Sequence, residues 1–61
     1  MEKYIYILAE GALETWQGDL PESDIQDAND GHIIIIRLSD LKTLFQDSDW
    51  VDIEFLPFKN Q

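Results

Sequence analysis

The stretch HIIIIRL at residues 32–38 decides the fold, because it contains four consecutive isoleucines. A continuous β-branched run of this length is typical of a strand that is buried on both faces. We therefore expect residues 32–38 to form a central strand of a sheet, with the other elements arranged around it.

A hairpin is predicted at the start of the chain. Residues 3–9 are rich in β-branched and aromatic types, and alternation places bulky side chains on both faces of the strand. Gly11 suits a tight turn, because glycine adopts positive φ without a steric penalty. Residues 12–17 would then return as a second strand, although the sequence ALE at its start also favours helix.

A short helix is predicted at residues 21–28. Pro21 suits the first position of a helix, and Glu22 and Asp24 would lie in the first turn, where the helix dipole favours negative charge. Gly31 is a suitable stop residue beyond its end. The alternative for this segment is an irregular acidic loop.

The end of the chain suggests a second helix and a last strand. Ser39 resembles an N-cap, and the leucines that follow fit a helical stripe, so we expect a helix over residues 40–46. Residues 50–56 alternate between apolar and acidic side chains and read as a strand near an edge of the sheet. Pro57 supports the edge position.

Together these elements predict a single compact domain over residues 1–61, of the α+β class. We expect a small mixed sheet of three or four strands, with one or two short helices packed on one face. The strand–helix–strand order of the last three elements implies a parallel pair if the two strands are adjacent, and a split arrangement if another strand lies between them.

Charge is the strongest functional signal. Thirteen acids and four bases give a formal net charge of −9, and the segment from Tyr4 to Ile36 contains seven acids and no lysine or arginine. Such a chain repels nucleic acids and anionic membranes and is attracted to basic protein surfaces. The alternative is that the acidity only keeps a small protein soluble.

Composition also suggests the cellular location. The chain has no apolar run long enough to cross a membrane, and it contains no cysteine. We therefore expect a soluble cytoplasmic protein with no membrane partner. Its four scattered basic residues do not suit direct binding to DNA or RNA.

The sequence does not match the usual motifs for catalysis or metal binding. His32 is the only histidine, and the three glycines are too far apart for a phosphate-binding loop. An EF-hand loop with Gly31 at its sixth position would place Gln26 at the first and Arg37 at the twelfth, where acidic ligands are required. We therefore expect no enzymatic activity, no cofactor and no specific metal site.

Two groups of residues are candidates for binding a partner. Trp50 shares a strand face with Asp52 and Glu54, and an exposed aromatic ringed by carboxylates suits a basic surface. The second group is the acids of the predicted helix and its end: Glu22, Asp24, Asp27 and Asp30. A weak cation site at the last three, and a core position for Trp50, are the alternatives.

The sequence thus predicts a small acidic, non-catalytic interaction module that docks on a basic protein. Its sharpest form is an inhibitor or nucleic-acid mimic that occupies the groove of a nucleic-acid-binding protein. The alternative is a structural or regulatory homo-oligomer, such as a homodimer, stabilised by pairing of strand edges. A chain of this size often needs a partner for full stability, which favours both readings.

Overall fold

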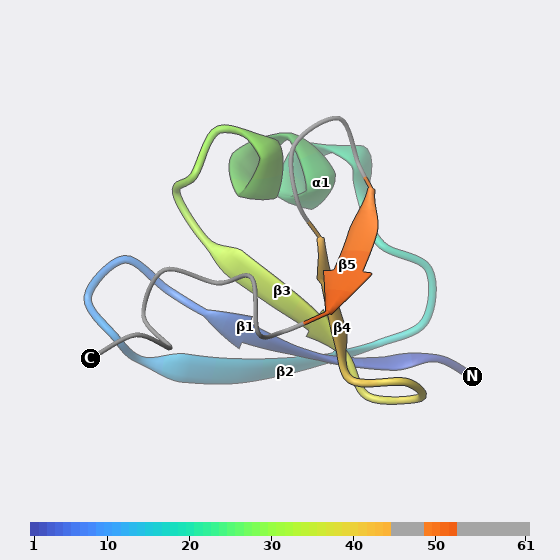
Figure 1. Ribbon diagram of the computed structural model, residues 1–61. Helices are drawn as coiled ribbons and strands as arrows, with labels where there is room; N and C mark the ends of the chain where they lie inside the picture. The colour runs from blue at the N-terminus through green and yellow to red at the C-terminus, as the bar shows by residue number, and fades with distance from the viewer. Residues whose placement is uncertain (45–48, 53–61) are drawn as a thin grey trace.

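Five strands form one antiparallel sheet, and one short helix packs against it. The computed structural model describes residues 1–44 and 49–52, and Figure 1 shows the arrangement. The strand order in the sheet is β2-β1-β3-β4-β5, with every neighbouring pair antiparallel. The elements are β1 (Lys3–Ile7), β2 (Leu13–Gln17), α1 (Glu22–Asn29), β3 (Ile34–Arg37), β4 (Lys42–Leu44) and β5 (Trp50–Asp52).

The expected α+β composition is therefore present, but the sheet differs from the prediction of three or four mixed strands. The sheet has five strands, and none of its described pairs is parallel. The prediction was wrong because it took residues 40–46 for a crossover helix between two strands. Residues 42–44 form β4 instead, so the chain runs from β3 to β5 as an antiparallel meander.

The predicted first hairpin is confirmed. β1 and β2 pair without interruption from Lys3 opposite Gln17 to Ile7 opposite Leu13. A three-residue loop joins them, closed by a 2.9 Å bond from the Leu8 N–H to the Ala12 carbonyl. Gly11 adopts a φ of 91°, the left-handed conformation that such a loop needs at its last position. The strand alternative for residues 12–17 is therefore the correct one.

Helix α1 is also confirmed, one residue later than predicted at each end. Pro21 precedes it in an extended conformation, and the Asp24 and Ile25 amides donate to the Pro21 carbonyl. At the other end the Gly31 amide donates to Ala28, and the His32 amide donates to Asp27. These two bonds, with Gly31 at a φ of 82°, form a Schellman motif, which satisfies the last carbonyls.

The predicted helix at residues 40–46 is wrong over residues 40–44, because a turn follows β3 directly, and residues 45–46 lie outside the described part of the chain. Arg37 and Asp40 are bound side chain to side chain across this turn, and the Asp40 carboxylate also accepts the Lys42 N–H at 3.3 Å. Leu41 has a φ of 55°, which a right-handed helix excludes. The chain therefore reverses into β4, and Leu44 enters the core from a strand.

β3 occupies the predicted central position, between β1 and β4. β5 lies at one end of the sheet beside β4, with Trp50 opposite Leu44, so it is near an edge as expected. Its predicted continuation over residues 53–56 lies outside the described residues.

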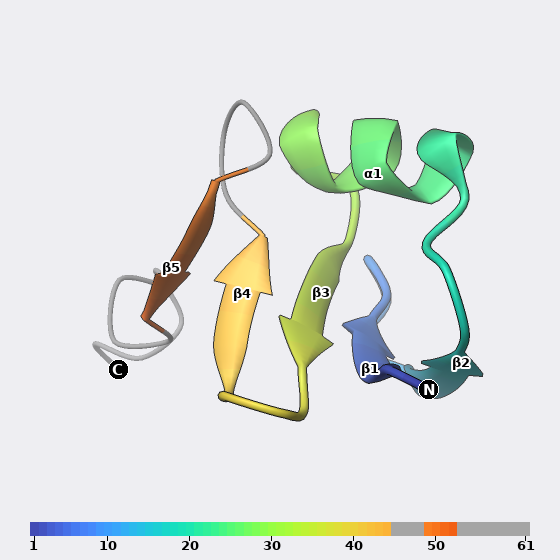
Figure 2. The same ribbon diagram turned by 90° about the vertical axis from the view of Figure 1, so that its right-hand side faces the viewer.

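The core lies between the sheet and α1. Its buried members are Tyr4, Tyr6, Ile35 and Leu44, and Ile25 and Ala28 of α1 pack against them. Figures 1 and 2 show α1 on one side of the sheet, near the end at which β3 begins. The opposite face carries the remaining isoleucines of β1 and β3, where Ile5 lies opposite Ile36 and Ile7 opposite Ile34.

Candidate functional site

The acids of α1 divide into an exposed set and one inward-facing residue. Glu22, Asp27 and Asp30 are exposed, and we call these three residues the acidic helix surface. Asp27 lies on the side of the helix away from Ile25 and Ala28, whereas Glu22 lies one turn before Ile25, and Asp30 is the C-cap residue. The helix has two acids in its first turn and no basic residue in its last turn.

Asp24 has a structural role. Its Oδ2 atom accepts a 2.6 Å hydrogen bond from the Tyr6 hydroxyl, and the residue is half-buried. Burial, followed by the Asp24 carboxylate, raises the pKa of Tyr6 well above its ordinary value. Tyr6 is therefore a neutral donor at physiological pH, and its bond to Asp24 fastens α1 to β1.

The acidic helix surface has few cations near it. His32 Nδ1 lies 3.9 Å from Asp27 Oδ1, and both side chains are exposed. Within residues 1–44 and 49–52, no lysine or arginine forms a salt bridge with Glu22, Asp27 or Asp30. The negative charge of this surface is therefore open to solvent and to a partner.

Trp50 lies in a cluster with a cation. Its ring stacks on Tyr4 with 6.1 Å between centroids, and the Arg37 guanidinium carbon lies 4.2 Å from its ring centroid. The Arg37 guanidinium in turn donates two hydrogen bonds to the Asp40 carboxylate. Nε donates to Oδ1 at 3.0 Å, and Nη2 donates to Oδ2 at 2.7 Å. Trp50 is thus partly buried, with its ring against Tyr4 of the core and against Arg37.

The two predicted groups of binding residues remain separate. Asp52 lies 4.0 Å from the Lys42 amine, so a base stands beside one of the two carboxylates expected near Trp50. Glu54 lies outside the described residues. Trp50 packs on the core side of the sheet, whereas the residues of the acidic helix surface are exposed to solvent.

Sequence reasoning missed the partners of Trp50. The cluster of Trp50, Tyr4 and Arg37 joins β5, β1 and β3, and only the strand order brings these three residues together. The pairing of Arg37 with Asp40 had a local signal, because opposite charges three residues apart on either side of a turn can meet. The helical interpretation of residues 40–46 concealed that signal.

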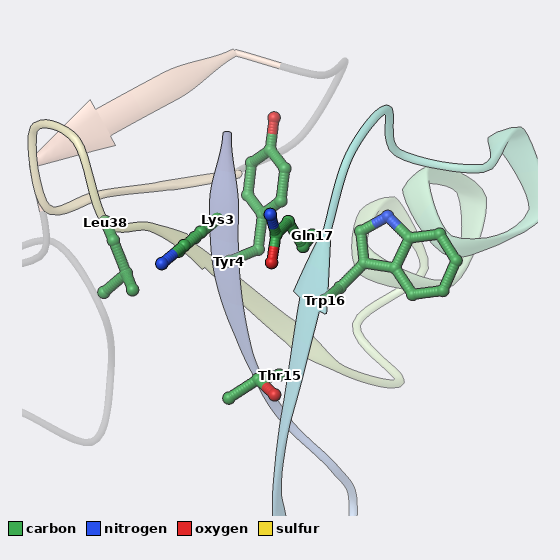
Figure 3. A pocket seen from close by; sticks show the side chains of 6 residues that line it. All are labelled: Lys3, Tyr4, Thr15, Trp16, Gln17 and Leu38. Atoms are coloured by element: carbon green, nitrogen blue, oxygen red, sulfur yellow. The ribbon is translucent and has the colours of Figure 1, made fainter. Parts of the chain in front are cut away.

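A shallow hollow of about 550 Å³ lies beside the first hairpin (Figure 3). Lys3, Tyr4, Thr15, Trp16, Gln17 and Leu38 line it. Among the described residues that line it, the titratable groups are the Lys3 amine and the Tyr4 phenol. Burial and then the charge of Glu2 raise the pKa of Tyr4, which keeps this phenol protonated at neutral pH.

Residues 1–44 and 49–52 contain no group of three or more potential ligands that could hold a metal ion. No helix among them is both long enough and apolar enough to cross a membrane.

Comparison with protein-family models, curated proteins and solved structures gives no match for this chain.

Proposed function

We propose that this chain is a small, acidic, non-catalytic interaction module that docks on a basic protein surface. In its sharpest form it is an inhibitor or nucleic-acid mimic that occupies the groove of a nucleic-acid-binding protein. The observation that carries the proposal is the acidic helix surface, whose carboxylates are exposed and have no lysine or arginine paired with them in the described part of the chain.

The charge distribution supports a protein partner over a nucleic acid. A net charge of −9 produces a long-range field that steers a basic surface toward the chain and repels phosphates. Such steering raises the association rate more than it lowers the dissociation rate. Binding should therefore weaken as salt screens the field.

The test is affinity purification with the chain as bait, at low and at high salt, with the captured proteins identified by mass spectrometry. The proposal predicts one or a few basic proteins whose capture decreases as salt rises. For the mimic form, adding duplex DNA or RNA should displace the captured protein from the bait. Capture that salt does not affect would contradict the electrostatic mode, and the absence of any specific partner would contradict the function.

The second candidate function is a structural or regulatory homo-oligomer. The observation that favours it is the outer edge of β2, where Leu13 is 68% exposed and Trp16 is 40% exposed. Two such edges could pair, as exposed strands often do. The charge of −9 on each copy opposes this association. Sedimentation at several concentrations distinguishes the two functions, because only the oligomer predicts a dimer without another protein.

A further inference from the structure

The outer edge of β2 is an unpaired sheet edge in the described part of the chain. β2 is the terminal strand in the order, with β1 as its neighbour, and all five of its residues are exposed. Two bonds fix the phase of the β1–β2 ladder: Leu8 N–H to the Ala12 carbonyl, and Gly18 N–H to the Glu2 carbonyl.

That phase determines which backbone groups face outward. In an antiparallel pair, residues that exchange both bonds alternate with residues that exchange none. Trp16 opposite Tyr4 and Glu14 opposite Tyr6 are therefore the bonded pairs. It follows that the N–H and C=O groups of Leu13, Thr15 and Gln17 point away from β1, toward the open side.

This edge lacks the usual protection against pairing. Natural edges are protected by lysine, proline, bulges or very short strands. β2 has the sequence LETWQ, with no lysine or proline, and it pairs with β1 through five consecutive residues without a bulge. Its one charge is Glu14, which attracts a cation and repels an anion.

An aromatic anchor stands at the same edge. The Trp16 indole Nε1 donates a 2.9 Å bond to the Asp19 carbonyl, which holds the ring in place while 40% of the residue stays exposed. Figure 3 shows Trp16 on the side of β2 away from Lys3 and Leu38, next to the segment that leads to α1. Tryptophan fixed in this way contributes contact area with little loss of side-chain entropy.

Charge indicates what kind of strand would bind here. Glu10 precedes β2, Glu14 lies within it and Asp19 follows it, whereas β1, the neighbouring strand, contributes one base, Lys3, opposite Gln17. A second copy of the chain would bring another net charge of −9 into the complex. A segment that carries lysine or arginine is attracted to it instead.

We propose that the outer edge of β2 accepts an extended, basic segment of the partner protein as an additional strand. The main chain of that segment bonds to the outward groups of Leu13, Thr15 and Gln17, and one of its side chains packs on Trp16. This mode of binding, β-strand addition, combines main-chain affinity with side-chain selectivity. The inference rests on the proposed function, because it names the part of a basic partner that this module holds.

The test compares two variants of one residue. Thr15→Pro removes an outward N–H but leaves the ladder to β1 intact, and proline is tolerated at edge positions of this kind. Thr15→Val keeps the N–H and is the matched control. The probe is a capped heptapeptide of alternating lysine and valine, with a glutamate–valine peptide of equal length as the charge control.

Two measurements are made on each protein. Peptide affinity follows from titration, and amide hydrogen exchange reports protection at Leu13, Thr15 and Gln17. We expect the lysine peptide to protect these three amides in the unmodified protein. We also expect Thr15→Pro to weaken its binding on the order of tenfold, and Thr15→Val to leave it nearly unchanged. The exchange measurement does not depend on the proline variant being folded.

Other outcomes would overturn the inference in distinguishable ways. Peptide binding without protection of the three amides would show electrostatic docking elsewhere, which leaves the proposed function standing. Protection that appears without peptide and rises with protein concentration would assign the edge to a second copy. No peptide binding at all would also overturn the inference, whereas the proposed function fails only if no salt-sensitive partner is captured.

Discussion

The Tyr6 hydroxyl donates a 2.6 Å hydrogen bond to Asp24 Oδ2, and this bond fastens the only helix in the described part of the chain to strand β1. Both residues lie at the junction between the core and the acidic helix surface. The orientation of the exposed acids therefore depends on a buried phenol that sequence patterns do not pair with Asp24.

We expect Tyr6→Phe to destabilise the fold. The change removes a hydrogen bond to a charged acceptor in a half-buried setting, which costs about 1–2 kcal/mol in the free energy of unfolding. Urea titration measures it. Tyr4→Phe is the matched control, because Tyr4 is buried to the same 7% exposure and its hydroxyl forms no hydrogen bond with other described residues. Equal losses in both variants would contradict the account.

The same bond predicts how stability depends on alkaline pH. The pKa of Tyr6 is raised in the folded protein, so the neutral phenol is favoured by folding. Its contribution is complete below the ordinary tyrosine pKa of 10.0 and is lost as pH rises from there toward the higher folded pKa. Denaturation at pH 8 to 11 should show this decline, and Tyr6→Phe should reduce it to the part due to Tyr4. An unchanged decline would argue against the assignment.

Arg37 connects the turn after β3 to Trp50. Replacing it with methionine removes the cation over the indole ring, which costs about 0.5–1 kcal/mol, and removes both bonds to Asp40. Those bonds hold the pKa of Asp40 below its usual value, so in Arg37→Met we expect the pKa of Asp40, measured by NMR, to rise. Lys42→Met is the control and should shift that pKa less. The reverse ranking would contradict the geometry.

Thr43 lies fully buried, and its Oγ1 donates a 2.9 Å bond to the Ile35 carbonyl. Thr43→Val has nearly the same shape but removes the donor, so we expect a loss of about 1 kcal/mol in thermal or chemical unfolding. Thr43→Ser keeps the hydroxyl and separates this loss from the effect of the missing methyl group. A valine variant as stable as the parent would show that the bond contributes nothing.

Leu41 has a φ of 55° and is 59% exposed at the tip of the turn. A left-handed conformation costs a non-glycine residue about 1–2 kcal/mol, and Leu41→Gly removes that cost. Glycine also raises the conformational entropy of the unfolded chain, which offsets part of the gain. We therefore expect Leu41→Gly to raise the free energy of unfolding by about 0.5–1 kcal/mol. Leu38→Gly is the control, because Leu38 does not have a positive φ, so glycine there relieves no strain and should lower stability. Destabilisation by Leu41→Gly would contradict the turn geometry.

Short stretches of sequence were enough to predict the central strand, the first hairpin and the helix. The isoleucine run gave the central strand, the turn glycine gave the hairpin, and Pro21 with Gly31 gave the ends of α1. Residues 38–44 were ambiguous, because leucines at positions 38, 41 and 44 fit a helical stripe and also fit a turn followed by a strand. The ion pair of Arg37 with Asp40 favours the turn, and its strength depends on the tertiary position of Arg37 over Trp50.

The candidate surfaces were predicted only in part, for a similar reason. Charge counting located the acids of α1, but it did not separate Asp24, which points to Tyr6, from Asp27, which is exposed. The open edge of β2 depends on strand order and ladder phase, which require the long-range pairings of β1. Such information is absent from spacing along the chain.

The measurement that tests the central claim most directly compares two charge variants in binding to the captured partner. Glu22→Gln with Asp27→Asn changes the acidic helix surface, and Glu2→Gln with Asp49→Asn changes two exposed acids elsewhere. Each pair takes the formal net charge from −9 to −7. We predict that the helix pair weakens binding on the order of tenfold at low salt and that the control pair weakens it far less. Equal effects of the two pairs, or no effect of either, would contradict docking through the acidic helix surface.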